Sequence, residues 1–166
     1  MMYSSDKQRA VFLDRDGVIN REKGKYIYEP EEFQLNEGLL EALEILKGRG
    51  FLFIVITNQG GIGLNLYTHD DVNKLNVMLT NILSAGGIEL AEIYYCPHHP
   101  KSGNCLCRKP DSLLIEKALA RFNLDPSGSY MIGDKARDIE AAEKAGVRGV
   151  LINANDSLLK YVENIT

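Results

Sequence analysis

The sequence lacks the long apolar segments that membrane-spanning and exported proteins carry. Its longest unbroken apolar run, residues 51–56, is only six residues long, whereas a transmembrane helix needs about 20. Residues 1–7 contain no apolar stretch behind a charge, as a secretory signal would. We therefore expect a cytoplasmic protein without a membrane partner.

Basic residues are neither in excess nor clustered. The chain has 19 Lys and Arg residues against 23 Asp and Glu residues, a formal net charge of −4. Proteins that bind the phosphate backbone of DNA or RNA usually present a basic patch or stripe. We expect no nucleic-acid partner.

Cysteine is scarce, and repeats, low-complexity segments and Gly/Ser/Pro linkers are absent. The three cysteines all lie between residues 96 and 107, close to histidines. An odd, crowded set of this kind is typical of a reduced compartment and a metal site rather than of a disulfide framework.

A chain of 166 residues buries about 70% of its unfolded surface without disulfides. We predict a single domain over residues 1–166 and a monomer.

Apolar runs rich in Val, Ile and Phe alternate with segments of helical period. The predicted strands are 10–13, 51–57, 93–96, 130–133 and 149–152. The predicted helices are 38–47, 70–84, 112–122 and 137–145, with Thr68 capping the second and Asp156 capping a last short helix. This alternation predicts an α/β fold with a central parallel sheet and helices on its faces.

Two carboxylates follow the first predicted strand. Asp14 and Asp16 are two positions apart, so both side chains leave the backbone on the same side. In open α/β sheets, ligands bind at the carboxyl ends of the strands. An isolated Asp-X-Asp-Gly sequence is also typical of an ordinary turn.

The second predicted strand ends in neutral hydrogen-bonding groups. Thr57, Asn58, Gln59 and Gly60 supply a hydroxyl, two carboxamides and backbone amides, which suit phosphate oxygens. The alternative is a turn in which Thr57 and Asn58 satisfy local backbone groups.

Charged residues accompany two later elements. Arg108 and Lys109 precede the helix at 112–122, where a cation can neutralise a bound anion. Asp134 follows the fourth strand and Asp138 lies in the first turn of the next helix. At Asp138, a site role and a simple helix-dipole role are nearly equal alternatives.

The ordered set of Asp14 and Asp16, Thr57, Lys109, and Asp134 with Asp138 resembles the four motifs of the haloacid dehalogenase (HAD) superfamily of aspartate-dependent phosphatases. The resemblance spans about residues 9–152. It implies a Rossmann-like three-layer sandwich and Mg²⁺-dependent hydrolysis of a phosphate monoester through an aspartyl-phosphate. No large insertion follows Asp16 or Gly60, so we expect no cap domain.

The resemblance assigns a role to each of these residues. Asp14 is the expected nucleophile and Asp16 the acid-base. Mg²⁺ is expected to bind Asp14, Asp134 and the peptide carbonyl of Asp16. Lys109 offsets charge on the transferring group, and Thr57 orients that group with Asn58. The chemistry demands cations, because a phosphate monoester repels an attacking carboxylate.

Four soft or borderline ligands lie in the segment 96–110. Cys96, His98, Cys105 and Cys107 form the sequence Cys-X-His, a six-residue gap, and Cys-X-Cys. Four protein ligands leave no open position, which predicts a structural Zn²⁺ that folds the loop. His99 is an alternative ligand, and unpaired cysteines without a metal are the other alternative.

The segments around these cysteines resemble the zinc-loop branch of the superfamily. Members of this branch act on a heptose bisphosphate or on histidinol phosphate. Ile19-Asn20, Tyr26-Ile27, Phe33 and Gly38 resemble the segment after the nucleophile in the heptose-bisphosphate group, and this favours removal of the 7-phosphate of a heptose 1,7-bisphosphate on the route to cell-surface polysaccharide. Two departures are the short gap between the histidine and Cys-X-Cys, which resembles the histidinol-phosphate group, and the lack of an arginine soon after the Thr-Asn-Gln sequence.

The expected small-molecule substrate is a sugar phosphate. The resemblance places Glu22, Lys23, Gly24 and Lys25 at the sugar, although a solvated charged loop is the alternative. The remaining predicted substrate-binding residues are Thr57, Asn58, Gln59, Gly60, Arg108, Lys109 and Lys135. Other functions to be tested are a histidinol-phosphatase, a DNA 3′-phosphatase and a zinc-organised binding module with an inactive site.

Overall fold

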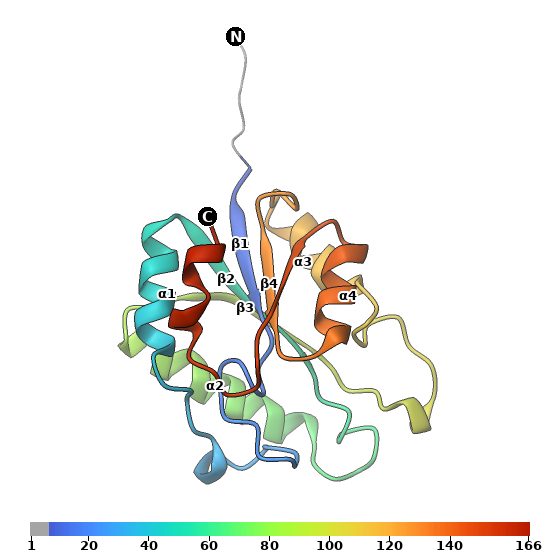
Figure 1. Ribbon diagram of the computed structural model, residues 1–166. Coiled ribbons are helices and arrows are strands. Elements are labelled where there is room, and N and C mark those ends of the chain that lie inside the picture. The colour runs from blue at the N-terminus through green and yellow to red at the C-terminus, as the bar shows by residue number, and fades with distance from the viewer. Residues whose placement is uncertain (1–6) are drawn as a thin grey trace.

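A five-stranded parallel sheet forms the centre of the protein (Figure 1). The structure, a computed structural model, describes residues 7–166. Residues 1–6, in which we expected no secretory signal, lie outside the described residues. The strand order is β3-β2-β1-β4-β5. The strands are β1 (Arg9–Leu13), β2 (Phe51–Asn58), β3 (Leu90–Cys96), β4 (Tyr130–Gly133) and β5 (Arg148–Leu151).

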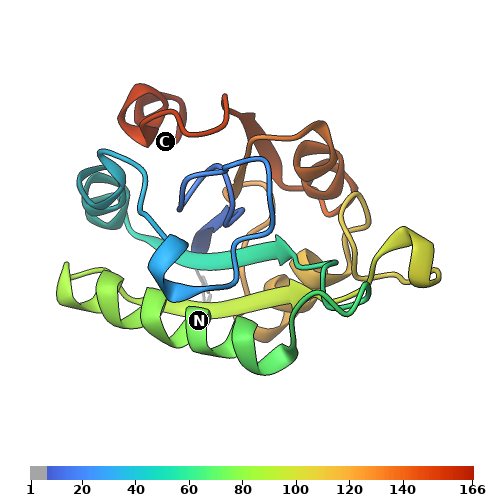
Figure 2. The ribbon, with the colours of Figure 1, turned by 90° about the horizontal axis from the view of Figure 1, so that it is seen from below.

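Helices cover both faces of this sheet (Figures 1 and 2). The α-helices are α1 (Leu39–Gly48), α2 (His69–Ala85), α3 (Leu113–Arg121) and α4 (Ala136–Lys144). Short 3₁₀ turns are η1 (Pro30–Glu32), η2 (Pro100–Ser102), η3 (Leu158–Lys160) and η4 (Val162–Asn164). The predicted α/β class, the three layers and the absence of a separate cap among residues 7–166 are confirmed.

Alternating residues of β1 supply the two cores. Val11 and Leu13 pack with α1 and α2, whereas Ala10 and Phe12 pack with α3 and α4. All four side chains are fully buried, as expected for a parallel strand covered on both faces. The continuous apolar run that predicted this strand therefore reflects burial on two sides.

The predicted cap of α2 is confirmed, and the predicted cap of the last short helix was wrong. The Thr68 hydroxyl accepts a hydrogen bond from the Asp71 amide at 3.2 Å, and the Asp71 carboxylate accepts one from the Thr68 amide at 2.9 Å. This reciprocal pair begins α2. The prediction that Asp156 caps the last helix was wrong, because Ser157 caps η3. Asp156 instead accepts hydrogen bonds from Lys160 and other side chains.

The strand order determines where the candidate site lies. Strands β2, β1 and β4 are neighbours and run parallel, so their carboxyl ends meet at the lower edge of the sheet in Figure 1. Thr57, Asp14 and Asp134 lie at these three strand ends. The order of strands, rather than the order of residues along the chain, brings them together.

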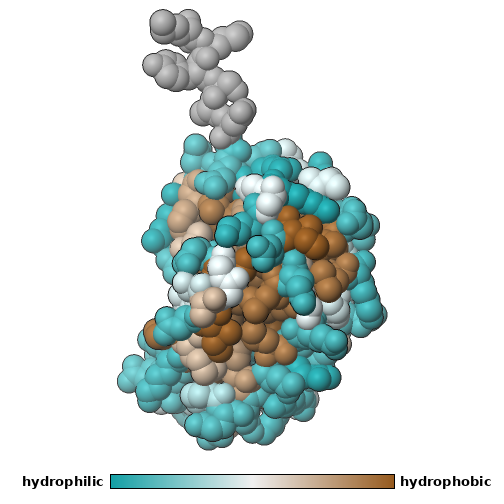
Figure 3. Space-filling view, turned by 90° about the vertical axis from the view of Figure 1, so that its left-hand side faces the viewer, coloured by the Kyte–Doolittle hydropathy of each residue, from teal (hydrophilic) through white to brown (hydrophobic). Residues whose placement is uncertain are grey.

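The surface away from this edge is partly apolar. Figure 3 shows apolar side chains gathered on the side where α1 lies, bordered by hydrophilic ones. Exposed apolar side chains of the flanking helices include Ile45 of α1, at 40% exposure, and Ile82 of α2, at 37%. No helix among residues 7–166 has both the length and the apolar character needed to cross a membrane.

Candidate active site

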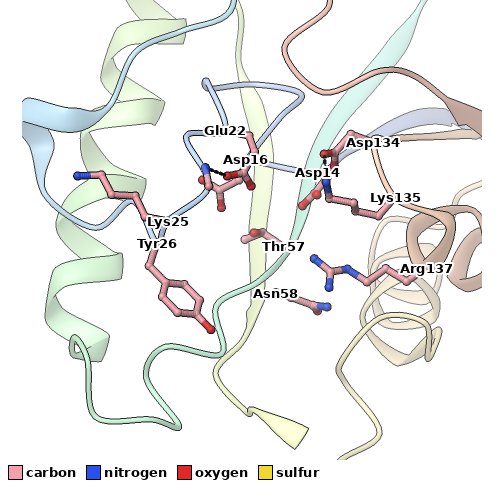
Figure 4. A pocket seen from close by; sticks show the side chains of 11 residues that line it. Asp14, Asp16, Glu22, Lys25, Tyr26, Thr57, Asn58, Asp134, Lys135 and Arg137 are labelled. Carbon is pink, nitrogen blue, oxygen red and sulfur yellow. Dashed lines mark hydrogen bonds and ion pairs between the residues drawn. The ribbon is translucent and has the colours of Figure 1, made fainter.

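A cavity of about 620 Å³ opens at the carboxyl ends of the central strands (Figure 4). Its volume falls within the range of small-molecule sites. Acidic, basic and neutral polar side chains share its wall. The lining residues are Asp14, Asp16, Glu22, Gly24, Lys25, Tyr26, Thr57, Asn58, Asp134, Lys135 and Arg137.

A buried lysine links two carboxylates behind the cavity wall. Lys109 Nζ lies 2.9 Å from Asp14 Oδ1 and 2.7 Å from Asp138 Oδ1. It also donates a hydrogen bond to the Ile56 carbonyl at 2.7 Å. The ammonium thus makes one hydrogen bond and two ion pairs, all within 3 Å. Lys109 does not line the cavity, and it acts on Asp14 from behind.

Asn58 determines where Lys109 lies. The carboxamide of Asn58 donates to the Lys109 carbonyl and accepts from the Lys109 amide, both at 3.1 Å. This two-bond pairing resembles a strand contact and joins the end of β2 to a segment 51 positions later in the chain. The sequence predicted a role for Asn58 towards phosphate, but it did not reveal this role towards the backbone.

Burial and charge shift the pKa values of this group. Burial raises the pKa of Asp14 from 3.8 to about 7, although the neighbouring Lys109 opposes the shift. Burial alone would lower the pKa of Lys109, but the carboxylates of Asp14 and Asp138 outweigh it and hold that pKa above its ordinary value. The group of two carboxylates and one ammonium thus carries an excess of negative charge.

A second set of carboxylates suits a divalent cation. Asp14, Asp134 and Asp138 each offer an oxygen, and these oxygens lie within 4.8 Å of one another. Both Asp134 oxygens are buried and accept no hydrogen bond, and their charged neighbour is the Lys135 ammonium, 3.1 Å from Oδ2. Such oxygens are costly to bury without a partner. The donor set therefore fits a hard cation such as Mg²⁺.

Gly17 leaves room for the Asp134 carboxylate. A Cβ atom at Gly17 would lie 2.6 Å from Asp134 Oδ2, and the backbone there has φ +89°. Both the space and the left-handed backbone exclude larger residues. The glycine of the Asp-X-Asp-Gly sequence is therefore required for the carboxylate cluster as well as for the turn.

The Asp16 carboxylate is held by several donors and lies outside that cluster of three. Arg15 Nη2 donates to both oxygens at 3.1 and 3.0 Å, and Asn20 Nδ2 donates to Oδ1 at 3.0 Å. Gln59 Nε2 donates to Oδ2 at 3.1 Å. The side chain remains 24% exposed, and Asp16 lines the cavity. Its carboxylate is therefore positioned firmly while it stays accessible to a substrate.

Asp138 combines the two alternatives that the sequence left open. Its Oδ2 accepts a hydrogen bond from the Lys135 amide at 3.0 Å at the start of α4. Its Oδ1 contacts the Lys109 ammonium. The same carboxylate thus caps the helix and belongs to the site.

The predicted substrate-binding residues divide into two groups. Glu22, Gly24, Lys25, Thr57, Asn58 and Lys135 line the cavity, whereas Lys23, Gln59, Gly60, Arg108 and Lys109 do not. The Lys23 ammonium donates to the Glu32 carbonyl at 2.8 Å. Lys25 pairs with the Glu32 carboxylate, and its ammonium points away from Asp14 in Figure 4.

Two lining residues, Tyr26 and Arg137, were absent from the predicted set. The Arg137 guanidinium points into the cavity near Asn58 (Figure 4), and no hydrogen bond or ion pair joins it to another residue within 7–166. A signal for it was present in the sequence. A cation in the first turn of a helix opposes the helix dipole, so its presence there suggests another role.

The four residues of segment 96–110 that were predicted to bind zinc lie together in the structure. Cys96, His98, Cys105 and Cys107 have ligand atoms within 4.8 Å of one another. The Cys96 and Cys105 sulfurs are 3.7 Å apart, and His98 Nδ1 lies 3.3 Å from Cys107 Sγ. Zn–S bonds of about 2.3 Å in a tetrahedron place sulfurs about 3.8 Å apart. The four groups therefore fit a closed structural Zn²⁺ site.

The structure separates the two histidines of this loop. His98 lies in the cluster, whereas His99 Nδ1 accepts a hydrogen bond from the Lys101 amide at 3.1 Å and begins η2. Arg108 donates to the His98 carbonyl at 2.9 Å. This hydrogen bond ties the residue next to Lys109 to the loop that carries the cluster.

Comparisons with known proteins agree with this geometry. The family described as HAD-hydrolase-like matches residues 106–160. A D-glycero-beta-D-manno-heptose-1,7-bisphosphate 7-phosphatase of Pasteurella multocida is 37% identical over 150 residues, which cover 87% of this chain and 81% of the relative. The chain belongs to this family of HAD-like phosphatases. Another member, a D-glycero-alpha-D-manno-heptose-1,7-bisphosphate 7-phosphatase of Burkholderia mallei, is 40% identical over 88% of this chain and 80% of its own length.

A solved structure of the same family supports the fold. The D,D-heptose 1,7-bisphosphate phosphatase of B. bronchiseptica, in complex with magnesium and phosphate, matches with a TM-score of 0.82 and 29% identity. The match covers 95% of this chain and 87% of that one. This match supports the α/β fold described above for the present chain.

Proposed function

We propose that this protein removes the 7-phosphate from D-glycero-D-manno-heptose 1,7-bisphosphate in a Mg²⁺-dependent reaction, within nucleotide-activated heptose biosynthesis for cell-surface polysaccharide. The observation that carries the proposal is the convergence of three carboxylates: Asp14 and Asp134 line a small-molecule cavity, and Asp138 offers an oxygen within 4.8 Å of theirs. The names of the relatives supply the substrate.

Asp14 is the nucleophile in this proposal. Its Oδ1 lies 2.9 Å from the Lys109 ammonium and accepts a hydrogen bond from the Arg15 amide at 2.8 Å, and these contacts hold the carboxylate so that Oδ2 can attack. A bond forms between Oδ2 and phosphorus while the bond from phosphorus to the sugar oxygen breaks. Lys109 holds the attacking carboxylate in place from the side away from the substrate.

Asp16 carries the proton in both steps. It protonates the departing sugar alkoxide, and it then accepts a proton from the water that attacks the phosphorus of the aspartyl-phosphate. That second attack breaks the bond to Asp14 and releases inorganic phosphate. Thr57, which lines the cavity beside Asp16 and Asp14, orients the phosphoryl group.

The carboxylates of Asp14 and Asp134, with the peptide carbonyl of Asp16, would hold the Mg²⁺. When bound, this ion offsets the negative charge of the phosphoryl oxygens and so reduces their repulsion of the nucleophile. The observation that supports this fit is the buried carboxylate of Asp134, whose oxygens accept no hydrogen bond from residues 7–166. Zn²⁺ at the four-residue cluster has a separate, structural role.

The charges of the cavity favour a bisphosphate over histidinol phosphate. Lys135 and Arg137 line the wall beside the catalytic carboxylates, and a second phosphate group requires such cations. An ammonium substrate would need a free carboxylate. Glu22, the acidic lining residue outside the catalytic group, already accepts a hydrogen bond from the Gly24 amide.

The proposal is tested by phosphate release from three substrates, each with and without Mg²⁺. These are the heptose 1,7-bisphosphate, histidinol phosphate and 3′-phosphorylated DNA. We expect Mg²⁺-dependent release from the first, and ³¹P NMR should show loss of the 7-phosphate and retention of the 1-phosphate. A higher kcat/KM for histidinol phosphate would contradict the substrate assignment but leave the phosphatase mechanism in place.

We also infer that the protein is a cytoplasmic monomer that binds no nucleic acid. The net charge of −4 supports the absence of a nucleic-acid partner. Sedimentation of the purified protein should give a mass near 18.5 kDa. A mass twice that value would contradict the monomer.

A further inference from the structure

Gln59 lies buried between three polar groups, although the sequence predicted that it binds substrate. Its side chain is 2% exposed. Its Nε2 donates to Asp16 Oδ2 at 3.1 Å and to Thr57 Oγ1 at 2.9 Å. The Tyr67 hydroxyl donates to Gln59 Oε1 at 2.8 Å. One carboxamide thus bridges the proposed acid-base and the hydroxyl that orients the phosphoryl group.

The chemistry of the partners determines the orientation of this carboxamide. The Asp16 carboxylate accepts hydrogen bonds from Arg15, Asn20 and Gln59, so the NH₂ group of Gln59 is the end that faces it. Rotation of the amide by half a turn would place its oxygen against the Asp16 carboxylate inside the protein. Two acceptors that face each other form no hydrogen bond, so the contact that holds Asp16 would be lost. At the opposite end, the Tyr67 hydroxyl donates to Gln59 Oε1 and so adds a hydrogen bond to the orientation in which Gln59 holds Asp16.

Tyr67 is itself fixed in place. It is 5% exposed, and its ring stacks on Tyr28 with centroids 4.9 Å apart and meets the Tyr26 ring edge-on at 5.7 Å. A Cβ atom at Gly61 would lie 2.1 Å from the ring. Burial raises the pKa of Tyr67 to about 12, so the hydroxyl keeps its proton and remains a donor at neutral pH.

We propose that Tyr67 is a positioning residue for the acid-base step: it fixes the carboxamide of Gln59, and Gln59 holds the Asp16 carboxylate in its catalytic position. The inference rests on the proposed function, because it takes Asp16 as the group that protonates the leaving alkoxide. Tyr67 touches no reacting atom. Its effect on the reaction passes through Gln59.

The test compares Tyr67→Phe with the wild-type protein on two phosphate esters. One is 4-nitrophenyl phosphate, whose phenolate leaves without protonation. The other is an alkyl phosphate, first the heptose 1,7-bisphosphate, whose alkoxide needs the proton from Asp16. We expect kcat/KM to fall about tenfold for the alkyl ester and less than twofold for the aryl ester. An equal loss on both esters would overturn the inference.

Tyr28→Phe is the matched control. It makes the same chemical change in the ring that stacks on Tyr67, while no hydrogen bond to the Tyr28 hydroxyl occurs within residues 7–166. We expect this variant to keep the wild-type ratio of the two kcat/KM values. A similar loss of alkyl-ester activity in Tyr28→Phe would show that the stacked aromatic group, and not the Tyr67 hydroxyl, is responsible.

A double-mutant cycle separates action through Gln59 from other routes. Gln59→Leu removes the bridge, so adding Tyr67→Phe should change kcat/KM less than twofold further. If the two losses multiply, Tyr67 acts by another route and the inference fails.

Side-chain NMR provides a readout that does not depend on turnover. The NH₂ resonances of Gln59 can be identified by their absence in Gln59→Leu. They should shift in Tyr67→Phe and stay in place in Tyr28→Phe; unchanged resonances in Tyr67→Phe would contradict the positioning role. A wild-type protein that hydrolyses neither ester would refute the proposed function, and the NMR result would still decide whether Tyr67 fixes Gln59.

Discussion

Asp14 shares its buried position with one ammonium and a second carboxylate. Lys109 contacts both Asp14 and Asp138 within 3 Å, so one positive charge faces two negative charges and leaves an excess of one. Removing one partner of a buried charged group leaves the rest uncompensated. For this group, however, removing one negative charge makes the remainder neutral. The charge of Asp14 is therefore needed for the proposed activity but lowers the free energy of unfolding.

We expect Asp14→Asn to abolish turnover and to stabilise the protein. The folded-state pKa of Asp14 is about 7, against 3.8 for the free group. Between these values the folded state binds more protons than the unfolded state, so the wild-type stability falls as pH rises from about 4 to about 7. The variant lacks this penalty, which at about 1.4 kcal/mol per pKa unit amounts to about 4 kcal/mol at pH 8 and to less at pH 5.

The measurement is denaturant unfolding in magnesium-free buffer that leaves zinc in place. Asp134→Asn is a useful comparison, since Asp134 makes no contact with Lys109. A lower stability of Asp14→Asn at pH 8 would contradict the proposed excess of negative charge.

Arg137 is the residue at which substrate specificity can be tested. Its guanidinium faces the cavity without a partner among the described residues. If it binds the second phosphate, Arg137→Ala should lower kcat/KM for the heptose 1,7-bisphosphate by about 10- to 100-fold, as loss of a charged hydrogen bond implies. Arg137→Lys should retain more activity.

A heptose 7-phosphate without the second phosphate is the control substrate for this prediction. Its kcat/KM should be the same in the wild-type protein and in Arg137→Ala. Equal losses on both substrates would assign Arg137 to the catalytic centre and not to the second phosphate.

At the scale of elements, the loop after β3 connects the cysteine cluster to the catalytic group. It starts at Cys96, the last residue of β3, and ends where Lys109 pairs with Asn58 of β2. Two anchors thus hold a segment with little regular structure, namely a metal-binding cluster and a carboxamide pairing. A loop anchored in this way can position a buried ammonium accurately.

Loss of zinc should therefore reduce catalysis as well as stability. We expect the wild-type protein to contain one Zn²⁺ per chain, and His98→Ala to lose it along with at least tenfold in kcat, because the segment carrying Lys109 loosens. His99→Ala is the matched control in the same loop and should keep its zinc. Metal analysis by atomic absorption, together with kinetics, checks both. Loss of zinc from His99→Ala alone would reverse the assignment of the two histidines.

At the scale of the whole molecule, one parallel sheet gathers groups from distant parts of the sequence. Residues 14, 57, 109 and 134 meet because β2, β1 and β4 lie side by side and because the loop before α3 returns to β2. No separate cap covers the cavity within residues 7–166. Asp14, Asp134 and Asp138 concentrate negative charge at this open edge, where a cation should stabilise the whole fold.

We expect Mg²⁺ to raise the melting temperature of the wild-type protein. At 100 times its Kd, an ion that binds only the folded state adds about 2.7 kcal/mol, which corresponds to about 5–10 °C for a domain of this size. Asp134→Asn should lose this shift. Asp16→Asn should retain it, because the Asp16 side chain lies outside the carboxylate cluster while its peptide carbonyl is unchanged. Thermal unfolding with and without Mg²⁺ measures all three proteins. A shift lost in Asp16→Asn and kept in Asp134→Asn would contradict the proposed ligands.

The sequence by itself determined the strands, the layers and the strand ends at which the polar residues lie. Apolar runs and helical periods are local patterns that reflect burial, so the alternation of strands and helices predicted the parallel sheet. The cluster formed by Cys96, His98, Cys105 and Cys107 was predictable for a similar reason, because its members lie within 12 residues of one another.

Only the tertiary structure decided which groups face the substrate and which support those that do. Asn58 pairs with a backbone segment 51 positions away, Gln59 contacts Asp16 across 43 positions, and Lys109 lies behind Asp14. In each case the packing of the elements determines which residue is the partner, and the neighbouring sequence does not reveal it. Carboxamides and lysines can bind either a ligand or a neighbouring residue, and the chemistry of the side chain alone does not distinguish the two.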